Sequence, residues 1–135
     1  MRIALRTDPY EQWFASVLVT IHGRTSEVEF KVDTGCNSLV LSHSTLKRFG
    51  IPTDAATLGK LPDESVRLAS GEKSPFKRLG EVALHHTDRN YICRAPAICH
   101  ATRKTNDLMG TVVFRQFTGV NFSLAVEKYM ELMKA

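Results

Sequence analysis

The sequence predicts a single, mostly β domain with one or two short helices. Apolar and polar residues alternate in several stretches, which is the period of a β-strand with one buried face. Clusters that contain Gly or Pro separate these stretches, and few segments have the spacing of a helix. A chain of 135 residues, 43% of them hydrophobic, is long enough for one core. We therefore expect one domain over residues 1–135, with its core at about residues 13–133.

The first part of the chain predicts a β-hairpin. Residues 13–22 carry apolar side chains at every second position, from Trp13 to Ile21. Residues 26–33 place Val and Phe on one side and charged residues on the other, as in a half-buried strand. The segment from Gly23 to Thr25 supplies the tight turn between them.

Four elements are expected in the middle of the chain. They are a short apolar strand at residues 38–42, a helix at 43–50, a polar connector at 52–65 and a second hairpin at 66–84. The helix is expected to end at Gly50 and to turn Leu46 and Phe49 inward. The hairpin has its tip at residues 70–73.

The last third of the chain predicts a strand, a buried apolar segment and a helix. They lie at residues 90–101, 108–110 and 111–117. Pro96 within the first of these favours an edge or a bulge, because Pro has no N–H to donate to a neighbouring strand. The final stretch fits two interpretations, either a helix capped by Ser123 or two strands at 120–122 and 129–133.

Charge and cysteine content limit the classes of function. The net charge is +4, but Lys and Arg are scattered along the chain, so we expect no nucleic-acid partner. No apolar run approaches the roughly 18 residues of a membrane span, and the apolar patch near the N-terminus is too short for a signal peptide. Three cysteines, an odd number, fit a reducing compartment. We expect a cytoplasmic protein without a membrane partner.

Asp33 is the residue that needs an explanation. It follows a strand that is apolar on one side, and Thr34, Gly35 and another apolar strand come directly after it. If the alternation continues, Asp33 lies on the same side as Glu29 and Lys31 and faces solvent. The alternative is an interior carboxylate held for chemistry, because an ionised carboxylate is costly to bury without compensation. Gly35 suggests a turn with φ > 0, which other residues resist.

The order of these features resembles the retropepsin-like aspartic proteases, the single-lobe relatives of the pepsins. The shared features are Asp-Thr-Gly after an alternating strand, a hairpin in mid-chain, and the Leu108–Met109–Gly110 segment before a helix. The resemblance covers nearly the whole chain and implies an acid-protease fold, a closed, barrel-like β lobe that works as a homodimer. It also implies an aspartic endopeptidase that acts on peptides or unfolded proteins.

The resemblance assigns a role to each part of the site. Asp33 is the catalytic carboxylate, and Thr34 and Gly35 support its loop. The expected flap over the substrate is at Ala69, Ser70 and Gly71, and the structural support behind the loop is at Leu108, Met109 and Gly110. No cofactor and no metal are expected.

One Asp-Thr-Gly per chain has a consequence for assembly. Hydrolysis by water needs a base for the water and an acid for the carbonyl, and two carboxylates that share one proton provide both. No second Asp-Thr-Gly or Asp-Ser-Gly follows along the chain. The second carboxylate is therefore expected from the Asp33 of another copy on a two-fold axis.

The sequence departs from the family pattern at two positions. Cys36 stands where Ala or Ser is usual, and a thiol is a weaker donor to the carboxylates than a hydroxyl, so activity at weakly acidic pH is expected. A small buried residue is the simpler interpretation of Cys36, and a redox-sensitive thiol is the other. After Gly110 the sequence Thr-Val-Val lacks the polar or charged residue of many relatives, which weakens the expected support of the loop.

Other functions fit the residues less well. A domain of this fold that dimerises or binds peptides and hydrolyses little is the main alternative, since fold does not fix function. An RNA-binding or acidic-ligand domain would rest on charge alone. Cys93, Cys99 and His100 have no zinc-binding spacing, so we interpret the two cysteines as buried apolar residues.

Overall fold

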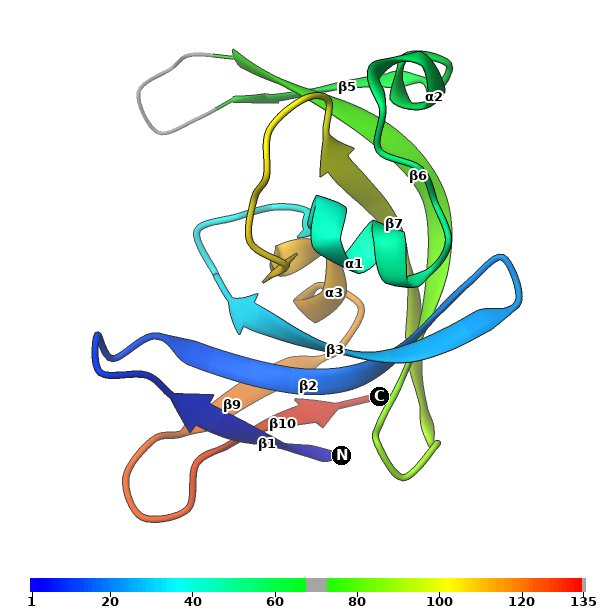
Figure 1. The fold of residues 1–135 in the computed structure, drawn as a ribbon. Helices are drawn as coiled ribbons and strands as arrows, with labels where there is room; N and C mark the ends of the chain where they lie inside the picture. Colours follow the sequence, from blue (N-terminus) through cyan, green and yellow to red (C-terminus); the bar gives the residue numbers. More distant parts are fainter. Residues whose placement is uncertain (68–72, 135) are drawn as a thin grey trace.

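The computed structural model describes residues 1–67 and 73–134 (Figure 1). Within these residues the chain forms ten strands and three short helices, so the predicted mostly β fold is confirmed. None of the described helices is both long and apolar enough to cross a membrane. The helices number one more than the two that the sequence predicted, and the additional helix is α2.

Six of the strands pair in a closed ring. The ring follows the order β2, β3, β8, β4, β7 and β6, and it closes because β6 also pairs with β2 from Leu18↔His85 to Thr20↔Ala83. The six strands are β2 (Trp13–Ile21), β3 (Arg24–Val32), β4 (Leu39–Val40), β6 (Lys73–His85), β7 (Tyr91–His100) and β8 (Leu108–Met109). Their inward side chains form the main core of the barrel.

The first hairpin forms as predicted, with a shorter turn. β2 and β3 pair in antiparallel register from Phe14↔Lys31 to Ile21↔Arg24. The turn is His22–Gly23 and not Gly23 to Thr25, with φ of 50° and 77°. Two consecutive residues with positive φ twist the chain in the sense that two-residue hairpin turns require. The pairing buries the alternating residues of both strands, including Val17, Val28 and Phe30.

Short strands in the middle of the barrel create a chain crossing. β8 is parallel to β3 and antiparallel to β4, and it lies between them. The chain therefore leaves β3 at Val32 and crosses the end of β8 before it enters β4 at Leu39. We call this segment, residues 33–38, the crossing, and Asp33 is its first residue.

The second hairpin is asymmetric. β5 (Asp63–Arg67) pairs with the first part of β6, from Asp63↔Lys77 to Arg67↔Lys73. The rest of β6 pairs with β7, with a register shift between Arg78 and Gly80, and Pro96 lies opposite Glu81 beside this irregularity. The residues expected to form the flap tip, Ala69, Ser70 and Gly71, lie outside the described residues.

Helix α1 (His43–Arg48) matches the prediction, and α2 (Ala55–Gly59) corrects it. Leu46 and Phe49 are buried, and Gly50 ends the α1 segment with φ of 75°. α2 lies in the stretch predicted to be a polar connector. The prediction missed the cap at Asp54, whose carboxylate accepts hydrogen bonds from the Thr57 N–H (3.0 Å) and hydroxyl (2.7 Å).

The C-terminal segment forms two strands, so the helical alternative is wrong. β9 (Gly119–Ser123) and β10 (Tyr129–Met133) pair with each other after the short helix α3 (Thr111–Phe114). β1 (Arg2–Thr7) then joins β10 to β2. Ile3 and Leu5 of β1 are buried in the main core together with Met130 and Leu132 of β10.

Asp107, just before β8, fixes the start of α1. Its two carboxylate oxygens accept hydrogen bonds from the Ser42 N–H (2.7 Å) and from the Thr45 hydroxyl (2.8 Å). Its backbone oxygen accepts a hydrogen bond from the Lys31 N–H (2.9 Å). The side chain of Asp107 thus connects the start of α1 to the start of β8, and its backbone connects the same point to β3.

Replacing Asp107 with Ala is expected to lower the free energy of unfolding by about 2–3 kcal/mol, because two donors lose their acceptor in a largely buried place. Urea unfolding of the variant measures the loss. Asp63→Ala is the matched control, because its carboxylate is 86% exposed in an ion pair with Lys77 and is expected to cost under about 1 kcal/mol. Equal losses in the two variants would contradict this role for Asp107.

Candidate active site

Asp33 is held at the start of the crossing by backbone hydrogen bonds. Its N–H donates to the Met109 carbonyl of β8 at 3.0 Å, and its own carbonyl accepts the Cys36 N–H at 3.2 Å. The Gly35 N–H donates to carboxylate oxygen Oδ1 at 3.0 Å. The side chain is half-buried, so it fits neither the fully exposed nor the fully interior alternative. Hydrogen bonds to β8 and within the loop thus hold the position of Asp33, while part of its side chain remains exposed to solvent.

Gly35 leaves space beside the Asp33 carboxylate and does not adopt the positive φ that the sequence suggested. Its φ is not among the positive values, which belong to Gly23, Gly50 and Gly80 among the described glycines. A Cβ atom at position 35 would lie 3.3 Å from Asp33 Oδ1. The absent side chain lets the Gly35 N–H approach the carboxylate closely. Thr34 and Gly35 are both exposed at the outer end of the crossing.

Gly110 supports the crossing from below. A Cβ atom at this position would lie 2.3 Å from the Cys36 carbonyl oxygen and 2.5 Å from that of Ser38. With no side chain in the way, the Gly110 N–H donates to the Ser38 carbonyl at 3.0 Å. The segment Leu108–Met109–Gly110 therefore lies directly against the loop that begins at Asp33.

The residues after Gly110 also bind the crossing, and sequence reasoning missed this. The Thr111 N–H donates to the Cys36 carbonyl (2.8 Å), and the Val112 N–H donates to the Asn37 carbonyl (3.0 Å). The Thr111 hydroxyl donates to Asn37 Oδ1 at 3.2 Å. The expected weakness after Gly110 is therefore wrong, because backbone donors and the Thr111 hydroxyl supply the support.

Cys36 is half-buried and bonded within its own loop. Its Sγ accepts the Ser38 N–H at 3.5 Å and lies 3.6 Å from the Ser38 carbonyl oxygen. The thiol therefore helps to shape the turn into β4. Because Cys36 is only half-buried, its interpretation as a small buried residue holds in part.

A small apolar cluster lies beside the crossing, apart from the main core. Val40 of β4, Phe76 of β6 and Ile98 of β7 are buried in it, and Cys36, Val66 and Leu108 pack against them. A neighbouring cavity of about 390 Å³ is lined by Asn37 and Ser38 of the crossing and by residues of β5, β6, β7 and α3. Apolar and polar surface thus adjoin the Asp33 loop below the β5–β6 hairpin.

Cys93 and Cys99 lie in the main core. Both are free thiols, and burial raises the pKa of each to about 11. The cause in both cases is burial, which disfavours the charged thiolate. This state agrees with their interpretation as buried apolar residues.

His100 closes the end of β7. Its Nδ1 accepts hydrogen bonds from the Thr102 N–H (3.1 Å) and the Arg103 N–H (2.8 Å). Its ring meets the edge of Phe76 with centroids 5.0 Å apart, so it connects the small apolar cluster with the segment that leads to β8. Burial, with the nearby Arg103 and His43, lowers the pKa of His100 from 6.5. The fold therefore favours the neutral ring, whose Nδ1 can accept.

The stabilisation by neutral His100 should be complete above about pH 6.5 and should disappear as the pH falls through the lower pKa of the folded state. We expect the free energy of unfolding of the wild type to fall relative to that of His100→Asn below that pH, by at most about 1.4 kcal/mol per pH unit. Asn keeps an acceptor but does not titrate. Urea unfolding of both proteins between pH 7 and 5 measures the difference, and parallel pH profiles would contradict it.

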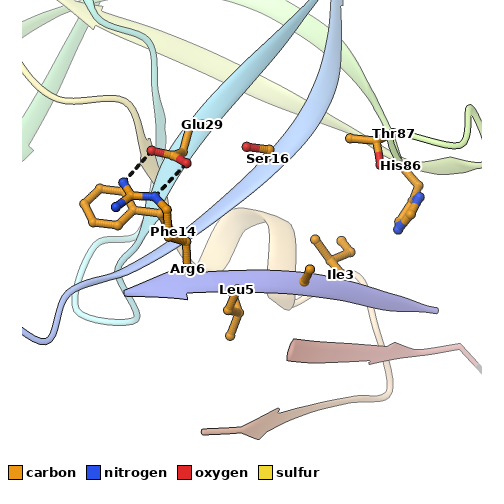
Figure 2. A pocket seen from close by; sticks show the side chains of 9 residues that line it. Ile3, Leu5, Arg6, Phe14, Ser16, Glu29, His86 and Thr87 are labelled. Carbon is orange, nitrogen blue, oxygen red and sulfur yellow. Dashed lines mark hydrogen bonds and ion pairs between the residues drawn. The ribbon is translucent and has the colours of Figure 1, made fainter. Parts of the chain in front are cut away.

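A second cavity, of about 290 Å³, lies on the outer face of β1, β2 and β3 (Figure 2). Arg6 and Glu29 bind each other across it, with N–O distances of 3.0 and 2.6 Å, and Arg6 also lies over the Phe14 ring. The Arg6 hydrogen bond lowers the pKa of Glu29. No residue of the Asp33 crossing lines this cavity, and its charged pair holds β1 to β3.

Comparisons with known proteins identify the family and the fold. A family model described as aspartyl protease matches residues 17–88, which include the crossing and both strands of the second hairpin. A crystal structure of a retropepsin-like aspartic protease from Rickettsia conorii has a similar fold, with a TM-score of 0.57. The two are 16% identical, over 96% of this chain and 89% of that chain. No curated protein matches the sequence.

Proposed function

The chain belongs to the aspartyl protease family and has a retropepsin-like fold, and from this premise we propose that it is an aspartic endopeptidase active as a homodimer. The observation that carries the proposal is the state of Asp33. The carboxylate is half-buried on a loop fixed by β8, and it accepts a hydrogen bond from the Gly35 N–H. A carboxylate that is held in place and partly exposed can contact both water and a substrate.

In the proposed reaction, Asp33 and the Asp33 of a second copy share one proton. Like charges a few ångströms apart do not both ionise, so one carboxylate acts as the base and the other as the acid. The base takes a proton from water as the water attacks the peptide carbonyl. The acid donates its proton to the carbonyl oxygen, which gives a tetrahedral diol. The first carboxylate then passes the proton it took from water to the amide nitrogen as the C–N bond breaks, and the other carboxylate takes a proton back from a hydroxyl of the diol. Aspartic proteases are the standard example of this pairing.

The remaining site residues are proposed to position this pair. Gly35 supplies a backbone donor, Thr34 at the exposed end of the loop faces the second copy, and the segment from Leu108 to Gly110 supports the loop. Ala69, Ser70 and Gly71 belong to the connection between β5 and β6 that we propose covers the substrate.

An extended peptide suits the surface next to Asp33. The cavity beside Asn37 and Ser38 is lined both by apolar residues, such as Ile98 and Val112, and by charged residues, such as Arg115. Unfolded protein segments present both kinds of side chain and free backbone groups. We therefore propose peptides and unfolded proteins as the substrates.

The test is mass-spectrometric mapping of cleavage in a mixed pool of unfolded peptides between pH 4 and 7.5. Cuts by the wild type that are absent with Asp33→Asn would support the proposal. Cuts that persist in the variant would show that Asp33 is not the catalyst. A dimer that makes no cuts would support the alternative, a retropepsin-fold module that dimerises or binds peptides.

A further inference from the structure

The cavity beside the crossing contains the charged residue Arg115. This residue directly follows α3, is exposed, and lines the cavity of about 390 Å³ together with Asn37 and Ser38. The other charged residues of the cavity are bound in ion pairs, Glu64 with Arg78 and Glu81 with Arg94. Within the part of the chain that the structure describes, no carboxylate lies at ion-pair distance from Arg115. Arg115 therefore gives the cavity a positive charge that these residues do not neutralise.

α3 holds Arg115 in place relative to the crossing. The helix begins on the crossing, where the Thr111 N–H donates to the Cys36 carbonyl at 2.8 Å. After its last turn, the side-chain amide of Gln116 donates to the Arg94 carbonyl of β7 at 2.7 Å. Arg115 Nε donates to the Thr111 carbonyl at 3.3 Å, so the two terminal nitrogens of the guanidinium remain available as donors to a ligand.

Asn37 supplies a second donor at the same cavity. The Thr111 hydroxyl donates to Asn37 Oδ1 at 3.2 Å, which orients the side-chain amide with its oxygen toward α3. The amide nitrogen, with its two hydrogens, then lies on the other side of an exposed side chain. A carboxylate accepts hydrogen bonds from both kinds of donor, and its bond to a guanidinium is of the strong, charge-assisted kind. The donors at this end of the cavity therefore fit a carboxylate.

A peptide in the proposed active site would pass this cavity. The cavity is lined by Asn37 and Ser38 of the crossing and by Glu64 and Arg78 of the β5–β6 hairpin, whose tip we propose covers the substrate. Figure 1 shows the crossing below this hairpin. The side chains of an extended peptide point alternately to its two sides. A peptide whose scissile bond lies at Asp33 can therefore direct one side chain into the cavity.

We propose that Arg115 and Asn37 bind an acidic side chain of the substrate, so that the enzyme prefers peptides with Asp or Glu at one position beside the cut. The inference rests on the proposed function, because it places a peptide between the crossing and the hairpin. The net charge of +4 also attracts acidic peptides, but it acts over the whole surface and favours no single position. A contact with Arg115 selects one position, and this difference can be measured.

The test uses one peptide that the wild type cuts, synthesised with Glu, Gln or Lys at each position beside the cut in turn. At low ionic strength and near-neutral pH we expect kcat/KM for Glu to exceed that for Gln about five- to tenfold at one position. Arg115→Gln should bring this ratio close to one, and Arg115→Glu should reverse the preference in favour of Lys. Arg89→Gln is the matched control and should keep the ratio, because Arg89 is an exposed residue between β6 and β7 that does not line the cavity.

The outcomes separate this inference from the proposed function. A wild-type ratio near one at every position, or a preference that Arg115→Gln leaves unchanged, would overturn the inference while the endopeptidase stands. If the wild type cuts no peptide, the endopeptidase is refuted and an NMR titration decides the inference. For this titration, Asp33→Asn receives a short alanine peptide with a single central Glu, or its Gln counterpart. The Arg115 Nε–H and Asn37 side-chain amide signals should shift with the Glu peptide alone, and equal shifts or no shifts would overturn the inference.

Discussion

Replacing Asp33 with Asn is expected to slow peptide cleavage by about 10²–10⁴-fold, since positioned acid–base groups contribute on this scale. The amide cannot take a proton from water, but its oxygen can still accept the hydrogen bond from the Gly35 N–H that the carboxylate accepts at 3.0 Å. The loop should therefore keep its shape, and the unfolding free energy should change little. Initial rates on one cleaved peptide, with urea unfolding alongside, measure both effects.

Mixing the variant with the wild type tests the shared pair directly. If both carboxylates come from position 33, a wild-type subunit works only with a wild-type partner. With nine variant subunits to each wild-type subunit, the rate per wild-type subunit should fall about tenfold once the subunits have exchanged. Asp88→Asn, with its carboxylate on an exposed turn, is the control and should leave the rate unchanged in the same mixture. If the rate per wild-type subunit does not change when Asp33→Asn is in excess, a single chain is sufficient for cleavage.

The alternation of apolar and polar residues, together with the glycines at turns, predicted much of the barrel. The alternation over residues 13–32 corresponds to the β2–β3 hairpin because one face of both strands is buried. The helix at 43–48 was predictable because Leu46, Phe49 and Gly50 mark its inner face and its end. Such patterns record local burial, which the sequence shows directly.

Features that depend on distant contacts were harder to predict. Residues 119–133 alternate weakly, and their strands are fixed by pairing with β1, more than 100 residues earlier in the chain. Asp107 gave no local signal beyond its place before an apolar pair, because its partners Ser42 and Thr45 are brought to it only by the fold.

In the candidate site, too, local features were predicted from the sequence and features that depend on distant contacts were not. Asp33 stood out in the sequence because a carboxylate at the end of a buried strand needs compensation. The positive φ suggested for Gly35 was predicted incorrectly, and a side chain there would instead lie tightly against Asp33 Oδ1. The support from Thr111 was missed because it acts through its backbone N–H and a hydroxyl contact with Asn37, both of which depend on the crossing.

Replacing Gly110 with Ala is expected to lower the unfolding free energy by about 3 kcal/mol or more, at the upper end of what overpacking costs. The new Cβ would lie 2.3 Å from the Cys36 carbonyl oxygen and 2.5 Å from the Ser38 carbonyl oxygen. Both neighbours are backbone atoms, so the clash cannot be relieved by rotating a side chain. Because φ at Gly110 is −103°, backbone conformation alone would allow Ala there, and the expected loss comes from contact.

The same clash should also lower the rate of peptide cleavage. The crossing has to move away from β8, which weakens the bonds from Gly110 to Ser38 and from Thr111 to Cys36 and shifts Asp33 with them. A displacement approaching 1 Å at a reacting group can cost about 10²-fold in rate. Gly59→Ala is the matched control, because an added Cβ there meets nothing within 4 Å, and it should keep both stability and rate. If Gly110→Ala were as stable as Gly59→Ala and cleaved peptides at the same rate, close packing of β8 under the crossing would not be what positions Asp33.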